Sequence, residues 1–450
     1  MHHMPASNEI DPIATRNPSG EAVYGVYGDA GSAVACLESE VRSYCRDFPA
    51  VFDRASGSLL FATDGRRIID FLSGAGALNY GHNHPELKAV LQAYLSEDRI
   101  AHALDLTTRA KTDFLCAFDE VILRPRRMNY KLQMTGPTGT NAVEAALKLA
   151  RKVTGRTDIA SFTNAFHGMT LGALAATGAR HKRGGAGQPL TNVVRLPFDG
   201  YLGPGIDTLD YVEKLLGDPG SGVQAPAAFI VEAVQGEGGL QVARAAWLER
   251  LQAIAHEYGS LLILDEIQVG IGRTGPFFCF EHADIRPDII VLSKSLSGFG
   301  LPMSMVLLSP NLDHWSPGEH NGTFRGNNLA FVTATRALDW WRDDWLEREV
   351  CRKAALLSAG LEAIIAALPA GSVCRKGVGL LQGLSFSAPA AARRMSQLAF
   401  QAGLMIETCG PHGEVVKFMP SLLIEDGLLQ EGLDLAKTAA EQAVSACPVQ

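Results

Sequence analysis

Short apolar runs alternate with helical stretches through the middle of the chain. Apolar residues recur on one face of a helix at residues 142–153 and 247–258. Short apolar runs between helices are typical of strands buried on both faces of a parallel sheet. We therefore predict a large α/β domain with a mostly parallel sheet. The predicted strands are residues 158–163, 227–234, 261–264, 288–293 and 305–309.

The two ends of the chain have a different pattern. Residues 58–71 predict two short strands around a turn at Asp64 and Gly65. Later in the chain, a long amphipathic helix is expected at about residues 333–365 and another helix at the end. Short strands are expected between these helices, near residues 379–386 and 415–420. This pattern favours a smaller α+β domain.

These patterns divide the chain into four segments. The N-terminal and C-terminal parts are expected to form one smaller domain beside the large one. The predicted segments are an irregular arm at residues 1–35, the first part of the small domain at 36–85, the large domain at 86–335, and the second part of the small domain at 336–450.

The composition is that of a folded globular protein. With 450 residues, 47% hydrophobic and 20% charged, the chain exceeds the size of a single core and is neither disordered nor a coiled coil. The 48 acidic and 40 basic residues leave a net charge of −8, which argues against a nucleic-acid partner. No apolar run reaches the roughly 18 residues of a membrane span, so no membrane association is expected.

Cysteine and histidine usage indicates a cytoplasmic protein without a metal site. The 8 cysteines are scattered without a CxxC pair, as in a reducing compartment. The first residues, MHHMPASNEIDP, contain no apolar signal core. His82 and His84 lie in an HNHP turn without a third ligand, and we interpret them as structural or interface residues.

Two carboxylates follow one of the predicted buried strands. Asp265 and Glu266 end the run LLIL, which places them at the sheet edge where open α/β sheets bind ligands. A nucleotide hydrolase would also need a GxxxxGK[ST] loop, and the chain has none. Residues 270–275 fit GxGxxG formally, but a proline and two phenylalanines follow where a dinucleotide site needs a helix. We interpret that match as accidental.

Lys294 follows another predicted strand. An amine at a strand end in a cleft loses hydration, which lowers its pKa and makes it a nucleophile toward aldehydes. The alternative is an ordinary solvated lysine. Glycines at positions 298 and 300 favour the first interpretation, since they allow close approach of the backbone.

A segment of small and hydroxyl residues, TGPTGTN at 135–141, leads into a predicted helix. Free N–H groups at such a helix start bind anions such as phosphate, although an ordinary cap by Thr138 or Thr140 has the same appearance. Together, the phosphate site, the acid and the lysine form the set that pyridoxal phosphate requires.

The motifs around these residues resemble class III aminotransferases of fold type I. The resemblance runs from about residue 38 to near the C-terminus. It implies a seven-stranded, mostly parallel central sheet, pyridoxal phosphate as cofactor, and a homodimer or a dimer of dimers with shared active sites. The motifs are LDEIQVG at 264–270, RTG at 273–275, Lys294, FHG at 166–168, VE at 231–232, QGE at 235–237, GTF at 322–324 and GN at 326–327.

Within this class, the sequence most resembles the subfamily that transfers an amino group from glutamate to aspartate 4-semialdehyde. The products are 2-oxoglutarate and 2,4-diaminobutyrate. The implied substrates are thus small amino acids and keto acids. The finer resemblance lies in residues 41–46, 74–85, 135–150, 293–302 and 319–328.

The resemblance assigns roles around the cofactor ring. Lys294 would hold the cofactor covalently, and Asp265 would pair with the ring nitrogen; these two are the expected catalytic residues. Gln268 would hydrogen-bond the phenolic oxygen of the ring. Phe166 and Ile267 would pack on its two faces.

Further roles concern the phosphate and the substrate. Gly139 and Thr140 would bind the phosphate, and Thr323 would reach the phosphate of a neighbouring subunit. Glu237 resembles the family's gate residue, which pairs with a basic group in one half-reaction and releases it in the other. Two more residues are expected beside the cofactor as supporting groups, His167 and Glu232.

The sequence departs from the family pattern at two positions. Relatives that act on ornithine often carry an arginine where this chain has Met169, and another family arginine is replaced by Lys417. A lysine offers a point charge where arginine offers a bidentate fork. We therefore expect altered carboxylate recognition, with Lys417 as the partner of Glu237 or of a substrate carboxylate.

The expected reaction is a transamination in two halves with ping-pong kinetics. The sequence is also compatible with other functions. They are another ω-aminotransferase (for ornithine, acetylornithine, lysine or 4-aminobutyrate), a pyridoxal-phosphate-dependent aminomutase or racemase, and a non-catalytic cofactor-binding scaffold. The presence of both Lys294 and Asp265 argues against the last.

Overall fold

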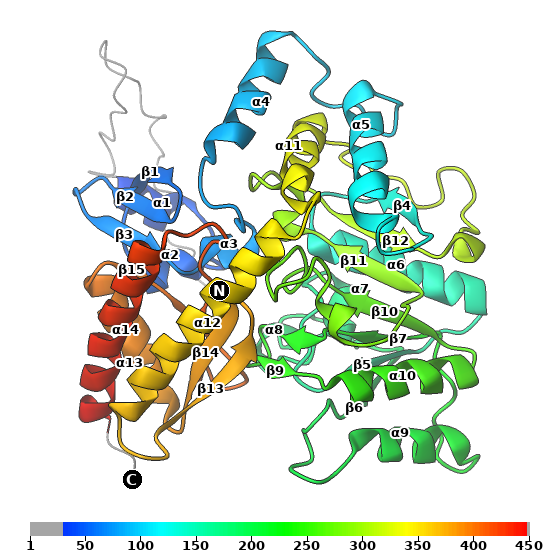
Figure 1. Ribbon diagram of the computed structural model, residues 1–450. Helices are drawn as coiled ribbons and strands as arrows, with labels where there is room; N and C mark the ends of the chain where they lie inside the picture. The colour runs from blue at the N-terminus through cyan, green and yellow to red at the C-terminus, as the bar shows by residue number, and fades with distance from the viewer. Residues whose placement is uncertain (1–29, 448–450) are drawn as a thin grey trace, which may run out of the picture. The chain divides into compact units, whose positions relative to one another are not determined.

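The computed structural model describes residues 30–447 (Figure 1). These residues fall into two compact units. The first unit comprises residues 30–54 together with Phe61–Arg67, and the second comprises the other described residues. Most of the predicted irregular arm lies outside the described residues. Its last part is helical, because the alanine-rich sequence AGSAVACL favours helix α1 (Ala30–Leu37).

The predicted turn near residue 64 is confirmed. The N–H of Ala62 donates to the carbonyl of Arg66 at 3.0 Å, between strand β2 (Leu59–Ala62) and strand β3 (Arg67–Asp70). A short helix α2 (Tyr44–Asp47) and strand β1 (Phe52–Ser56) precede these strands.

A seven-stranded sheet forms the centre of the second unit, with strand order β4-β12-β11-β10-β7-β5-β6. β10 pairs in parallel with β11 and β7, whereas β12 is antiparallel to both of its neighbours. The mostly parallel sheet is thus confirmed. The predicted strands appear as β5 (Ile159–Phe162), β7 (Ala228–Val231), β10 (Leu261–Asp265), β11 (Ile289–Leu292) and β12 (Met305–Leu308).

The apolar pattern did not reveal the two edge strands of this sheet. β4 (Lys131–Met134) and β6 (Val193–Leu196) are short and each contains polar residues, since an edge strand needs less apolar surface. The predicted strand at residues 227–234 is also divided. Its last residue begins β8 (Val234–Gln235), which pairs with β9 (Gln241–Val242) in a separate ribbon.

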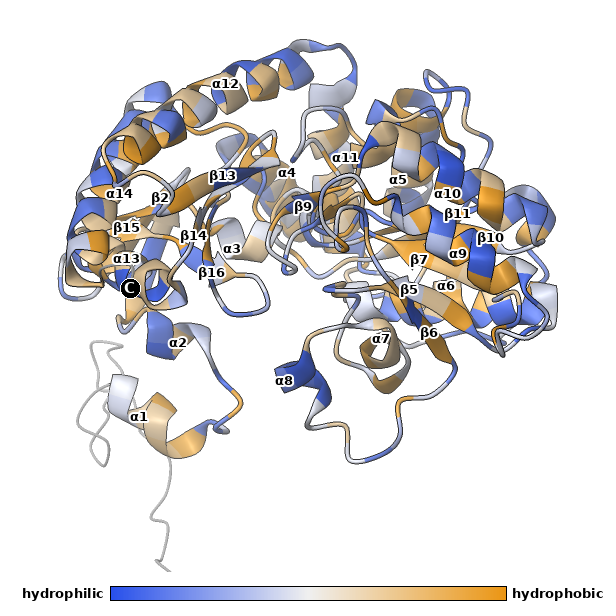
Figure 2. Ribbon diagram, turned by 90° about the horizontal axis from the view of Figure 1, so that it is seen from below, coloured by the Kyte–Doolittle hydropathy of each residue, from blue (hydrophilic) through white to orange (hydrophobic). Residues whose placement is uncertain are grey.

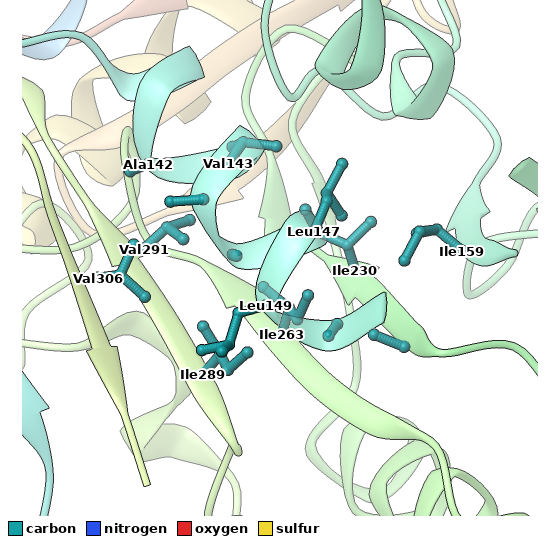
Figure 3. Packing of buried hydrophobic residues seen from close by; sticks show 14 of the residues in the cluster. Ala142, Val143, Leu147, Leu149, Ile159, Ile230, Ile263, Ile289, Val291 and Val306 are labelled. Carbon is teal, nitrogen blue, oxygen red and sulfur yellow. The ribbon is translucent and has the colours of Figure 1, made fainter. Parts of the chain in front are cut away.

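Helix α6 (Gly139–Thr154) packs on the central sheet and confirms the helix predicted at residues 142–153. Its apolar face, including Val143 and Leu147, contacts Ile230, Ile263 and Ile289 of the strands (Figure 3). The strands are apolar while the covering helices carry both polar and apolar sides (Figure 2). The other helices of this region are α7 (Leu171–Ala176), α8 (Arg180–Arg183), α9 (Thr208–Gly217) and α10 (Ala245–Glu257).

The prediction of a single long helix at residues 333–365 is wrong. The chain forms α11 (Asn328–Leu338), a 3-10 turn (Asp339–Trp341) and α12 (Trp345–Ala366). The break lets the buried Trp341 donate its indole N–H to the hydroxyl of Tyr80 at 2.8 Å. Helix α11 packs against two helices that follow the N-terminal strands. These are α4 (Pro85–Ser96) and α5 (Arg109–Phe118), preceded by the short α3 (Ser73–Gly76).

The C-terminal part contains an antiparallel sheet covered by helices. In strand order, the sheet contains β13 (Val373–Val378), β14 (Leu381–Phe386), β17 (Val415–Phe418) and β16 (Glu407–Cys409). The helices are α12, α13 (Pro389–Gln401) and α14 (Asp426–Ala446). β15 (Leu404–Met405) pairs in parallel with Ile69 and Asp70, so a C-terminal strand extends an N-terminal one. The domain boundaries at residues 36, 86 and 336 remain predictions.

One buried cation connects three parts of the second unit. Arg273, fully buried, donates to the carbonyl oxygens of Leu380 (3.1 Å) and Pro420 in the C-terminal part. It also donates to the side-chain oxygen of Asn79 at 2.6 Å. The N–H of Asn79 in turn donates to the hydroxyl of Ser295 at 3.0 Å. Arg273 therefore connects the loop after β10 to Asn79 on one side and to the C-terminal sheet region on the other. Among residues 30–447, no helix is long and apolar enough to cross a membrane.

Candidate active site

The candidate residues meet at one edge of the central sheet. Asp265 is the last residue of β10, Glu232 directly follows β7, and Lys294 comes two residues after β11. Because these three strands run in parallel, their carboxyl ends lie at the same edge. The structure thus brings together side chains that are far apart in the sequence.

Asp265 is held by a histidine. Nδ1 of His167 lies 2.7 Å from Oδ2 of Asp265, and both side chains are buried. The N–H of Ile267 donates to Oδ1 of the same carboxylate at 3.1 Å. His167 was predicted to lie beside the cofactor, but this bond was not predicted. His167 lies in the loop after β5, and no local sequence pattern indicates which acid it will contact.

Glu232 supports the loop that carries Phe166. Its Oε2 accepts the N–H of Phe166 at 2.9 Å. Burial, and then the nearby Asp265 carboxylate, raise the pKa of Glu232 well above its ordinary value. We infer that this acid orients the Phe166 backbone.

A lysine that the sequence analysis did not select lies against Phe166. Nζ of Lys182 is 4.3 Å from the centre of the Phe166 ring, a cation–π distance. Lys182 belongs to the basic helix α8, whose Arg183 donates to the carbonyls of Leu174 (3.0 Å) and Thr177 (2.9 Å). The run RHKR was a visible signal for this cationic group.

Lys294 has the properties of a reactive amine. Its backbone has a φ of +50°, a left-handed conformation that costs a non-glycine residue about 1–3 kcal/mol and is typical of functional sites. Burial lowers its pKa to about 8, against the opposing effect of Glu237. No hydrogen bond or ion pair joins its Nζ to another of the residues 30–447. The amine is therefore available to an aldehyde.

The start of α6 forms the candidate phosphate site. Thr138 caps the helix, and its N–H donates to Oδ1 of Asn141 at 3.2 Å. The hydroxyls of Thr140 and Thr170 lie 2.7 Å apart. A Cβ on Gly139 would come within 2.9 Å of Ile267, so a glycine lets the helix start approach Ile267.

Gln268 lies between the loop of Glu237 and the turn at residue 75. Its Nε2 donates to the carbonyl of Ala75 at 3.2 Å and to Oε1 of Glu237 at 3.4 Å. A Cβ on Gly236 would lie 1.7 Å from Oε1 of Gln268, so a larger residue at position 236 would displace the Gln268 side chain. The same Oε1 is buried without a hydrogen-bond partner.

Lys417 lies between two carboxylates. Its Nζ is 2.8 Å from Oε1 of Glu237 and 2.9 Å from Oε1 of Glu407. Burial acts to lower the pKa of Lys417, but Glu237 and then Glu407 outweigh it and raise the pKa well above its ordinary value. Burial would raise the pKa of Glu237, yet Lys417 and Lys294 lower it to about 2. The contact between Lys417 and Glu237 had been offered as a hypothesis, and the structure contains it. The contact between Lys417 and Glu407 was not predicted, because it depends on the register of two strands.

The structure leaves Thr323 apart from these groups. It is exposed in the loop before α11, and no hydrogen bond within residues 30–447 joins it to the site. His82 contacts Asp70, with Nε2 2.7 Å from Oδ2. Within the same residues, no cluster of three or more His, Cys, Asp or Glu side chains could hold a metal ion.

The site residues fit pyridoxal phosphate. Lys294 offers an unpaired amine, Asp265 an oriented carboxylate, and the start of α6 free N–H groups for an anion. Two polar atoms that line the site, Nε2 of His167 and Oε1 of Gln268, are buried without partners. Buried polar atoms without partners are costly, and a bound ligand would satisfy them.

Known proteins are similar to this chain over most of its length. The family described as Aminotransferase class-III matches residues 42–439. A diaminobutyrate–2-oxoglutarate transaminase of Halalkalibacterium halodurans is 53% identical over 408 residues, which cover 91% of this chain and 96% of that protein. A protein of the same name from Bordetella parapertussis is 54% identical over 411 residues, which cover 91% and 94%.

Solved structures show the same fold. The ornithine aminotransferase of Toxoplasma gondii, described with partial occupancy of pyridoxal phosphate at its active site, superposes with a TM-score of 0.80 at 25% identity. The match covers 92% of this chain and 94% of that chain. A Bacillus anthracis aminotransferase has a TM-score of 0.81 at 23% identity, with coverage of 90% and 96%.

Proposed function

This chain belongs to the class III aminotransferases, and we propose that it interconverts L-2,4-diaminobutyrate and 2-oxoglutarate with L-aspartate 4-semialdehyde and glutamate. One observation carries the proposal. Relatives named for this activity are 53% and 54% identical to the chain over 91% of its length. The site supports it, since Lys294, Asp265 and Gln268 lie together at the sheet edge.

Different residues of the site have different roles in the reaction. Pyridoxal phosphate, the cofactor of this family, supplies an aldehyde that takes up the amino group and a ring that accepts electrons. Asp265, oriented by His167, keeps a proton on the ring nitrogen. Nζ of Lys294 would act as the base that takes up the proton leaving the substrate carbon that bears the amino group.

Glu237 and Lys417 distinguish the two half-reactions. With the diamine, Glu237 stays paired with Lys417 at 2.8 Å, and no cation is offered to a carboxylate next to the reacting carbon. With glutamate, the side chain of Glu237 turns away, and the ammonium of Lys417 binds the α-carboxylate. Lysine provides this contact as a point charge.

A substrate panel tests the proposal. The purified enzyme with diaminobutyrate and 2-oxoglutarate should form glutamate at least tenfold faster than with ornithine, lysine or 4-aminobutyrate. Lys294→Ala should abolish the reaction with every donor. Faster turnover of ornithine or 4-aminobutyrate than of diaminobutyrate would contradict the substrate assignment. Conversion of diaminobutyrate without added 2-oxoglutarate would instead indicate a different reaction type, such as an aminomutase or racemase.

We also propose that the enzyme is a homodimer with shared sites. Large apolar side chains are exposed in two adjacent segments, and exposed apolar patches mark protein interfaces. The segments touch, since the rings of His102 and Phe324 are 5.2 Å apart and His102 bridges to Asn327. Thr323 lies within the second segment, so a docked copy would receive it. The exposed residues are Ile100, Leu104, Leu106 and Phe324, at 56%, 45%, 61% and 65%.

A cytoplasmic location is proposed from the thiols. All 8 cysteines are free, and Cys36, Cys116 and Cys374 are among the exposed ones. Exposed free thiols persist in a reducing compartment. Cell fractionation that recovered the enzyme with a secreted marker would contradict this location.

A further inference from the structure

Lys417 has two carboxylate partners, and they differ in how firmly the fold holds them. Glu407 is in β16, directly opposite Lys417 of β17 in the antiparallel register. Its side chain is 9% exposed. Opposite charges on directly paired residues of neighbouring strands stabilise such a pair. Glu407 is therefore a fixed partner.

Glu237, in contrast, is in an irregular segment between β8 and β9. Glycines at positions 236, 238 and 239 flank it, and its side chain is 26% exposed. Its backbone is held, because its carbonyl accepts the N–H of Gly410 at 3.0 Å. The side chain can thus rotate while the main chain stays in place.

This asymmetry matters when a substrate carboxylate replaces Glu237. Lys417 is fully buried, and a buried ammonium without a partner is strongly unfavourable. If Glu237 were its only partner, the flexible lysine side chain would follow Glu237 as it turned away. A second, fixed carboxylate keeps the ammonium paired and in place during the exchange.

We propose that Glu407 is a positioning residue for the glutamate half-reaction. It holds the ammonium of Lys417 at the substrate site while Glu237 gives way to the α-carboxylate of glutamate. The inference rests on the proposed function only in assigning glutamate as the amino donor. The diamine half-reaction, in which Glu237 stays paired with Lys417, does not depend on Glu407 in this way.

The test compares the half-reactions in single turnovers of the cofactor-loaded enzyme. The quantity compared is the ratio of maximal rate to apparent Kd for each half-reaction. Glu407→Gln should lower this ratio about tenfold or more for glutamate. For diaminobutyrate the ratio should fall less than threefold. Glu407→Asp keeps the charge and should fall between wild type and Glu407→Gln. Glu414→Gln removes a carboxylate from the β16–β17 turn that makes no ion pair with Lys417, and it should leave both half-reactions unchanged.

A binding measurement provides a second readout. The aldehyde form of the enzyme cannot transaminate 2-oxoglutarate, so calorimetry reports affinity alone. Glu407→Gln should weaken this affinity about tenfold while cofactor content and melting temperature stay close to wild type. Equal losses in both half-reactions would show a merely structural role, and unchanged glutamate kinetics would also overturn the proposal.

Failure of this inference is distinguishable from failure of the proposed function. The glutamate and 2-oxoglutarate measurements do not require diaminobutyrate. If the wild-type enzyme ignored that diamine, the comparison would use whichever ω-amine it accepts.

Discussion

At the scale of single residues, the chemistry depends on the partners that each side chain has or lacks. Within residues 30–447 the amine of Lys294 has no hydrogen-bond or ion-pair partner, whereas Lys417 has two carboxylates. The same residue type is thus suited to act as a nucleophile in one place and as a fixed cation in the other. The two pKa values move in opposite directions for this reason, down to about 8 for Lys294 and well above the ordinary value for Lys417.

The pKa of Lys294 predicts how cofactor-free enzyme captures pyridoxal phosphate. Only the neutral amine attacks an aldehyde, so below about pH 8 the rate constant should rise about tenfold per pH unit. Above about pH 8 it should level off. Stopped-flow absorbance measures this rate, and Lys294→Ala controls for non-covalent binding. A rate that kept rising beyond pH 10 would show an unshifted lysine.

Residue types at strand ends were readable from the sequence, but contacts between them were not. Asp265 and Lys294 follow apolar runs, and this pattern alone predicts that both lie at the sheet edge. Glu407 also follows a short apolar run, residues 404–406, so its position alone does not single it out. Its role comes from facing Lys417 on the neighbouring strand, and strand register depends on the whole pattern of buried residues.

At the scale of elements, the apolar pattern predicted the buried strands and failed where burial is incomplete or a helix bends. The central strands β7 and β11 are buried throughout, and β10 is buried from Leu262 onward, so their sequences are nearly continuous apolar runs. Strands β4 and β6 lie at the edges and lack that signal. The break between α11 and α12 depends on the contact of Trp341 with Tyr80, which no local pattern contains.

The segment around Glu237 provides a prediction at this scale. Gly236→Ala places a Cβ 1.7 Å from Oε1 of Gln268, so that side chain must move. We expect kcat/KM to fall about a hundredfold, equivalent to about 2.7 kcal/mol, with the fold retained. Steady-state assays and melting curves measure both effects.

Gly427→Ala is the matched control. Gly427 lies in the first turn of α14, and a Cβ there meets no atom within 4 Å. This variant should keep full activity and gain up to about 1 kcal/mol of stability, because alanine favours a helix more than glycine does. Equal activity of the two variants would show that Gln268 tolerates displacement.

At the scale of the whole molecule, the proposed dimer makes a measurable prediction. Phe324→Asp puts a charge into the exposed apolar patch and should weaken self-association at least thirtyfold, or by about 2 kcal/mol. Light scattering across a dilution series measures the dissociation constant. Activity should fall with the dimer, since Thr323 is expected to complete the neighbouring site.

A substitution outside the patch controls for surface charge. Tyr211 is 49% exposed in α9, and Tyr211→Asp should leave both mass and activity unchanged. If the Phe324→Asp variant stayed dimeric at every concentration, the subunit contact would have to lie elsewhere.

The buried guanidinium of Arg273 limits how such an enzyme can adapt to two substrates. It lies in the loop after β10 and donates to the side chain of Asn79 and to the carbonyls of Leu380, just before β14, and Pro420, after β17. If these parts opened about a hinge, the guanidinium would be left buried without a partner, and this would cost several kcal/mol. Substrate exchange must therefore proceed by rotation of side chains within a rigid frame. Catalysis should consequently persist in crystals, where large movements are blocked.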